Sequence, residues 1–209
     1  MRQGAGVASG LGSSYLTTMF IQTEATPNPE VLKFLPGREV LGAGQTREFN
    51  SSEEAKASPL ADAIFEAGGI KRVFFGSDFV TATKYVELEW RQLKAPILAA
   101  IMEHYTSGAP MLIGEAAPQE AVSDRTYDGE TAQIVAEIKD LLDTRIRPAV
   151  AQDGGDILFS RFDVNTGVVY LNMRGACSGC PSSAMTLKAG VENMLKHYVP
   201  EVTAVEAVA

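Results

Sequence analysis

The stretch NMRGACSGCPSSAMTLKAG, residues 172–190, decides how the second half of this chain folds. It carries both cysteines of the protein, Cys177 and Cys180, with Pro181 directly after the second. A β-prone run precedes the pair and a helical pattern follows it, so we expect the thiols in a loop between a strand and a helix. The partial positive charge at a helix N-terminus favours a thiolate over a thiol, which predicts two metal-binding or reactive sulfurs.

The segments on either side of this loop predict a compact α+β domain. Amphipathic periodicity indicates helices, and two β-rich runs joined by Asn-Thr-Gly indicate a hairpin. The predicted elements are a helix over residues 131–147 ended by Pro148, a hairpin over 156–175, a helix over 182–198 and a last strand over 202–208.

Two further motifs lie beside the cysteine loop, and we interpret both as structural. The pair Gly154-Gly155 lacks the lysine and spacing of a phosphate-binding loop, so it predicts a turn that enters a strand. Asp153 and Asp156 have no His, Ser or Lys partner nearby, so we expect solvated loop residues rather than catalytic acids.

Residues 19–113 predict a second, separate α+β domain with no obvious chemical group, for which partner recognition is the natural role. Short β-prone runs interrupted by prolines are typical of edge strands and turns. The predicted elements are edge strands within residues 20–37, a helix over 59–67 capped by Ser58, a hairpin over 70–87 and a helix over 89–105.

Residues 114–130 separate the two domains and carry five acids but only one large aliphatic side chain, so they predict a flexible acidic linker. Residues 1–18 are rich in Gly and Ser and predict a disordered extension. The fold class expected is therefore α+β, with two small domains, 19–113 and 131–209, joined by that linker.

Composition excludes several functions. A net charge of -8 argues against nucleic acid as the main partner, and no apolar run is long enough to span a bilayer. Two cysteines in a chain of 209 residues are not the pattern of a disulfide-stapled secreted domain. We expect a reducing compartment, the bacterial cytoplasm, with the mitochondrial matrix as the alternative.

Ligand counting limits what the two thiols can do. A structural zinc or an iron-sulfur cluster usually needs four ligands, and beside its two thiols this chain has two histidines, His104 and His197. His197 is expected some 22 Å along its helix from the loop at 1.5 Å per residue, and His104 lies in the other domain. A second copy of the chain is the simpler source of two more thiolates. The pair also fits a dithiol oxidoreductase, with Cys177 as nucleophile and Cys180 as resolving thiol.

The string DGGDI at residues 153–157, followed by a hairpin and by GACSGCP at 175–181, closely resembles the C-terminal domain of NifU-like (Nfu-type) iron-sulfur proteins. That resemblance covers about residues 130–209. The stretches IQTEATPNPEVLKFLPG and GGIKRVFFGSDFVTATK resemble the N-terminal domain of Nfu proteins, so the likeness extends over nearly everything after Met19.

The resemblance implies a carrier or scaffold rather than an enzyme. It implies a 4Fe-4S cluster, with 2Fe-2S as the other form, bound by Cys177 and Cys180 and bridging two protomers. It further implies a homodimer when loaded, apo iron-sulfur proteins as clients and an upstream scaffold as the cluster donor. No catalytic residue is expected.

Overall fold

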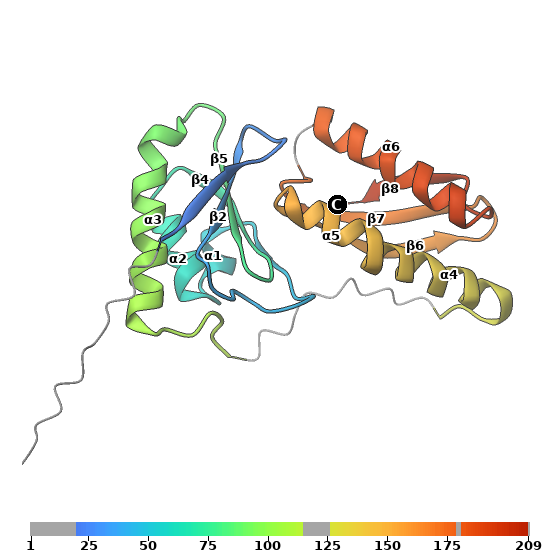
Figure 1. The fold of residues 1–209 in the computed structure, drawn as a ribbon, viewed down its shortest axis with the longest axis horizontal. Coiled ribbons are helices and arrows are strands. Elements are labelled where there is room, and N and C mark those ends of the chain that lie inside the picture. Colours follow the sequence, from blue (N-terminus) through green and yellow to red (C-terminus); the bar gives the residue numbers. More distant parts are fainter. Residues whose placement is uncertain (1–19, 115–125, 179–180, 209) are drawn as a thin grey trace, which may run out of the picture.

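A computed structural model describes residues 20–114, 126–178 and 181–208. It contains one five-stranded and one three-stranded sheet, each with helices packed against it, and the two units lie side by side (Figure 1). The α+β class predicted from the sequence is therefore confirmed. The predicted extension, residues 1–18, and residues 115–125 of the predicted linker lie outside the described residues.

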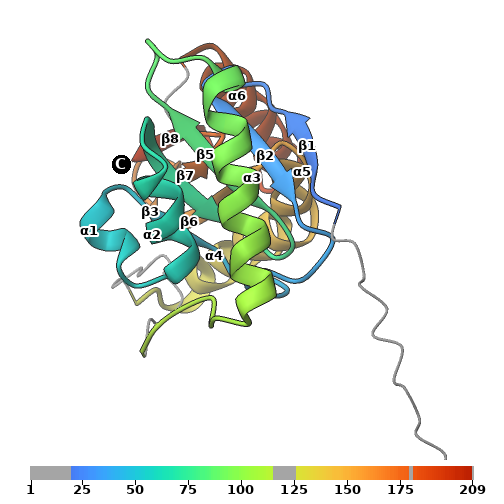
Figure 2. The same ribbon diagram turned by 90° about the vertical axis from the view of Figure 1, so that its left-hand side faces the viewer.

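The first unit is an antiparallel sheet with strand order β1-β2-β5-β4-β3. Helices cover only one of its faces, while the other faces the second unit (Figures 1 and 2). The elements are β1 (Gln22–Ala25), β2 (Val31–Leu35), β3 (Arg47–Phe49), α1 (Ser52–Ala55), α2 (Pro59–Glu66), β4 (Ile70–Phe75), β5 (Val80–Lys84) and α3 (Trp90–Ser107).

The predicted helices and hairpin of this unit are present, but one prediction about its strands is wrong. We expected two edge strands before residue 37, whereas β2 lies inside the sheet between β1 and β5. The prolines that suggested edges all fall in the connections outside β1 and β2, so none of them removes a donor from the ladder. The short elements β3 and α1 were not predicted.

The core of the first unit lies between the sheet and helices α2 and α3. Apolar residues of α3 recur at helical spacing, and Leu93, Ile97 and Ile101 are buried as their spacing predicted. His104 continues that stripe at 7% exposure, and desolvation lowers its pKa. His104 is thus a core residue of α3.

The second unit pairs β6 with β7 in antiparallel fashion and β7 with β8 in parallel. Two helical segments pack on this sheet, and their apolar faces form the core with buried residues such as Ile138, Ile157 and Leu195. The elements are α4 (Gly129–Leu141), the π-helical segment η1 (Leu142–Ile146), α5 (Arg147–Gln152), β6 (Gly155–Asp163), β7 (Val168–Gly175), α6 (Pro181–Tyr198) and β8 (Ala204–Val208).

The first helix of this unit does not end at Pro148 as predicted. It continues to Gln152 because a π-helical turn, η1, precedes the proline. The N–H of Arg147 bonds to the carbonyl of Leu142, five residues back, so the ladder is already interrupted where Pro148 lacks a donor. None of the helices within the described ranges is long and apolar enough to cross a membrane.

The β6–β7 turn ties the hairpin to the segment that leads into β8. Gly167 has φ +71°, its N–H donates to the Asp163 carbonyl at 2.7 Å, and its carbonyl accepts from the N–H of Thr203 at 2.8 Å. A Cβ at this position would lie 2.5 Å from the carbonyl oxygen of Glu201. Glycine is therefore required by both the backbone conformation and the close approach.

We predict that Gly167→Ala lowers the free energy of unfolding. The left-handed backbone alone costs a non-glycine residue roughly 1–2 kcal/mol, and the contact with Glu201 adds to that. Thermal unfolding followed by circular dichroism measures the effect as a fall of several degrees in the midpoint.

The matched control is Gly190→Ala within α6, where a Cβ would meet nothing within 4 Å. Replacing glycine by alanine inside a helix should stabilise the chain by about 0.5–1 kcal/mol. An unchanged midpoint for Gly167→Ala would contradict the role given to this turn.

Candidate metal centre

Cys177 lies in a tight turn directly after β7. The N–H of Cys177 bonds to the Arg174 carbonyl at 3.3 Å, and the N–H of Ala176 bonds to the carbonyl of Gly154 at 3.1 Å. The second contact holds the cysteine loop against the turn that enters β6. The predicted position of the thiol between a strand and helix α6 is confirmed for Cys177, while Cys180 lies outside the described residues.

Three glycines make this close approach possible. Gly154 and Gly175 have positive φ values of +83° and +61°, and a Cβ on Gly175 would lie 2.7 Å from the Gly154 carbonyl oxygen. A Cβ on Gly155 would overlap the Sγ of Cys177. The Gly154-Gly155 pair is the strand-entry turn that the sequence predicted, and its further role is to leave room for the thiol.

The thiol of Cys177 is not the thiolate that its place before a helix predicted. Its residue is 5% exposed, and burial, followed by the negative charges of Asp153 and Asp156, raises its pKa to about 12. In this arrangement the sulfur is protonated at neutral pH. Exposure to solvent or coordination to a metal would be needed to ionise it.

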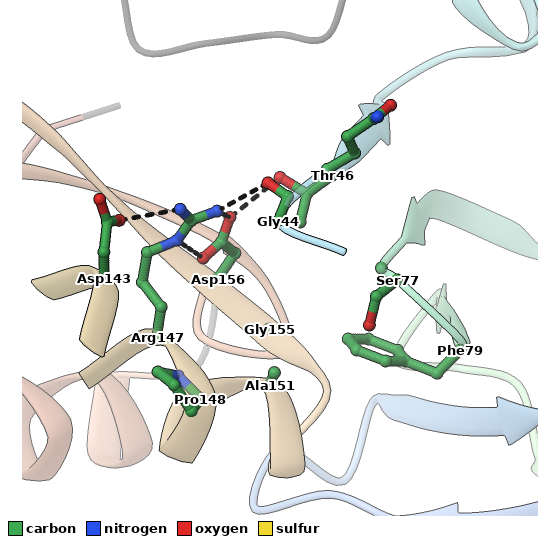
Figure 3. A pocket seen from close by; sticks show the side chains of 12 residues that line it. Gly44, Thr46, Ser77, Phe79, Asp143, Arg147, Pro148, Ala151, Gly155 and Asp156 are labelled. Carbon is green, nitrogen blue, oxygen red and sulfur yellow. Dashed lines mark hydrogen bonds and ion pairs between the residues drawn. The ribbon is translucent and has the colours of Figure 1, made fainter. Parts of the chain in front are cut away.

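Asp156 differs from the prediction of a solvated loop residue. It is 3% exposed, and its two carboxylate oxygens accept from Nε and Nη2 of Arg147 at 2.8 and 3.0 Å (Figure 3). That paired carboxylate raises the pKa of Arg147. Asp153, in contrast, is exposed as expected. In the sequence, Arg147 lies in the predicted helix nine positions before Asp156, and no local pattern marks it as the partner of this carboxylate.

The first unit also contributes polar groups to this end of the second. The hydroxyl of Thr46 donates to Asp156 at 2.9 Å, and Nη2 of Arg147 donates to the Gly44 carbonyl at 3.3 Å (Figure 3). These groups line a cavity of about 220 Å³ together with Ser77 and Phe79. Sequence reasoning missed them because the contact exists only once both units are folded.

The described residues do not complete a ligand set around Cys177. Within residues 20–114, 126–178 and 181–208, no group of three or more His, Cys, Asp or Glu side chains is placed to hold a metal ion. His104 lies in the core of the first unit and His197 in the last turn of α6, so both stand apart from the cysteine loop as the sequence predicted. A four-ligand site at Cys177 thus needs donors beyond the described part of one chain.

The chain combines two small α+β units with a glycine-flanked cysteine loop in the second, and two family models match its sequence. The model "Scaffold protein Nfu/NifU N terminal" matches residues 21–108, and the model "NifU-like domain" matches residues 138–206. The chain belongs to the Nfu/NifU family. The first range contains all five strands of the first sheet, and the second contains β6, β7 and the start of β8.

Named relatives agree with these matches. The chain is 52% identical over 189 residues to "NifU-like protein 5, mitochondrial" of Arabidopsis thaliana, covering 90% of this chain and 68% of the relative. It is 52% identical over 191 residues to "NFU1 iron-sulfur cluster scaffold homolog, mitochondrial" of Drosophila persimilis, covering 91% of this chain and 66% of the relative. The chain thus spans about two thirds of the length of these relatives.

A solved NifU-like protein from Saccharomyces cerevisiae is 26% identical and covers 54% of this chain and 98% of its own. The TM-score between the two structures is 0.43.

We predict that alkylation of Cys177 in the folded apo chain is slow. Measured by mass spectrometry in a Cys180→Ser background at pH 8, its rate with iodoacetamide should rise at least about a hundredfold in urea. The raised pKa means that the rate in the folded chain should still be increasing above pH 9, where an ordinary thiol approaches its plateau. A folded-state rate close to the urea rate would contradict the buried placement.

We predict that Arg147→Met destabilises the second unit by about 3–5 kcal/mol, because Asp156 would remain buried without its ion-pair partner. Chemical denaturation measures this loss.

The control is Asp143→Asn, which removes the other carboxylate bound to the same arginine. The Asp143 side chain is 61% exposed, so its loss should change the free energy of unfolding by less than about 1 kcal/mol. Equal effects of the two substitutions would show that burial of Asp156 is not the deciding factor.

Proposed function

We propose that this protein is an iron-sulfur cluster carrier that binds a 4Fe-4S cluster between two copies of the chain and passes it to apo-proteins. Cys177 and Cys180 of each copy are the proposed ligands. The cluster is cargo, and we assign no catalytic residue. A 2Fe-2S form would use the same four thiolates.

One observation carries this proposal: the chain has two thiols in a glycine-flanked loop and no further ligands grouped around Cys177 among the described residues. Iron-sulfur clusters are held by four cysteine thiolates in most proteins. Two copies related by a twofold axis supply that number. The relative from Drosophila persimilis, named an iron-sulfur cluster scaffold homolog, supports the same reading.

A shared cluster suits delivery because each subunit contributes only two iron–sulfur bonds. A client thiol can replace one carrier cysteine at a time, so that each bond broken is matched by one formed. The proton of the incoming thiol passes to the departing cysteine, and no electron moves.

The alternative of a dithiol oxidoreductase is less consistent with the site. An attacking cysteine is partly exposed and has a lowered pKa, whereas Cys177 is 5% exposed. The names of the relatives also describe no redox enzyme.

The partners follow from the proposed role. Clients are apo iron-sulfur proteins with free cysteines, and an upstream scaffold supplies the cluster. The relatives are named mitochondrial, which gives no support to the bacterial cytoplasm that we first expected and favours the alternative, the mitochondrial matrix.

Anaerobic reconstitution with iron and sulfide tests the proposal. We expect a brown dimer with about four irons per two chains. Cys177→Ser should lose the stable cluster, because each dimer would keep only two thiolates. Iron analysis and size-exclusion chromatography measure both properties.

Ala176→Ser is the matched control, since it places the same hydroxyl one residue away in the same buried loop and leaves both thiols. It should keep the cluster. A full cluster in Cys177→Ser would exclude Cys177 as a ligand, and turnover of a disulfide substrate without iron binding would favour the oxidoreductase.

A further inference from the structure

The face of the five-stranded sheet opposite helices α2 and α3 is polar yet buried. Side chains alternate along a strand, and one core residue on each of four strands points to the helical side of the first unit: Phe34, Phe49, Val73 and Val80. Their neighbours in sequence therefore point to the other face. These neighbours, which are nine-tenths or more buried, are Lys33 on β2, Glu48 on β3, Phe74 on β4 and Thr81 on β5.

The part of the second unit that covers this face is the cysteine loop with the turn beside it. The carboxylate of Glu48 accepts from the backbone N–H of Gly175 at 2.9 Å, and the guanidinium of Arg72 donates to the hydroxyl of Ser178. A Cβ on Gly175 would lie 3.0 Å from the ring of Phe74. The residues on both sides of Cys177 are thus held by the first unit.

A third contact lies at the other side of the sheet. The ammonium of Lys33 donates to the carbonyls of Ala151 and Gln152 at 3.2 and 3.0 Å, at the C-terminal end of α5. A cation is favoured at a helix C-terminus, where the carbonyls have no partner in the helix. Since β2 and β3 are separated by β5 and β4, Lys33 and Glu48 hold the loop region from two distant strands.

These contacts conflict with the state in which the loop would hold a cluster. A site shared by two copies requires their cysteine loops to face each other, and the residues flanking Cys177 are covered by the sheet. A thiolate-bound cluster is also anionic and accepts hydrogen bonds from backbone N–H groups. Glu48 places a negative charge on one such donor, the N–H of Gly175.

We propose that the polar face of the first sheet is a docking surface for this chain's own cysteine loop, and that the loop must leave it before a second copy and a cluster can bind. The docking concerns the apo chain alone, whereas its competition with loading rests on the proposed function. Glu48 and Arg72 hold the loop itself, and Lys33 holds the end of α5 beside it.

The first test needs no cluster and uses hydrogen exchange of the Gly175 amide, measured by NMR in the full apo chain. In the unmodified protein this amide should be protected, and Lys33→Met should accelerate its exchange by about tenfold. Lys33 does not touch Gly175, so faster exchange at Gly175 in this variant would show that the cysteine loop and the end of α5 leave the sheet together. Lys71→Met, at an exposed position of β4, is the control and should leave the rate unchanged.

Two results would overturn docking: an unprotected Gly175 amide in the unmodified apo chain, or the same exchange rate in a folded Lys33→Met variant. The unmodified chain decides the first point even where the variant does not fold.

The second test compares rates of cluster loading during anaerobic reconstitution. Lys33→Met should load about tenfold faster than the unmodified chain and reach the same final iron content. If Lys33→Met exchanges its Gly175 amide faster but loads at the same rate as the unmodified chain, docking does not compete with cluster loading. The carrier function would be unaffected by that result. Failure of every variant to bind iron would remove the carrier function, and the exchange result would still decide docking.

Discussion

The ion pair between Arg147 and Asp156 is the interaction on which the arrangement around the cysteine loop depends. It joins the helical segment α4–η1–α5 to the first residues of β6, and it is almost fully withdrawn from water on the carboxylate side. A buried carboxylate is costly unless its lone pairs are occupied. Here Arg147 supplies two donors, the hydroxyl of Thr46 a third and the N–H of Ile157 a fourth.

Because that carboxylate is fixed, the glycine turn beside it is fixed too. Gly154 and Gly155 then bring β6 so near to the end of β7 that only glycine fits at Gly155 and Gly175. Cys177 is consequently positioned by backbone rather than by other ligands. Within the described residues the loop thus holds a buried thiol by its backbone and brings no group of metal-binding side chains to it.

Local patterns predicted most of the helices and strands, since amphipathic spacing, the Ser58 cap and the Asn-Thr-Gly turn act over a few residues. The prediction for Pro148 was wrong because a π-helical turn precedes the proline, and the helical spacing along the chain gave no sign of that turn. The same limit applies to the site. Spacing identified the cysteines, but it did not reveal their surroundings. Cys177 is buried against Gly155, 22 residues away, and Asp156 is buried by Arg147 of the preceding helix and by Thr46 of the other unit.

The polar character of the docking face decides how firmly the two units can hold each other. Each buried hydrogen bond between them contributes only about 0.5–1.5 kcal/mol net, since both partners give up water. The attraction between Glu48 and Arg72, at 3.6 Å, is offset by the free energy that both groups lose when they leave water. An apolar face of equal area would bind more firmly and would expose a hydrophobic patch on release. A polar face keeps the released state compatible with water, so separation of the two units leaves no large apolar surface exposed on this sheet.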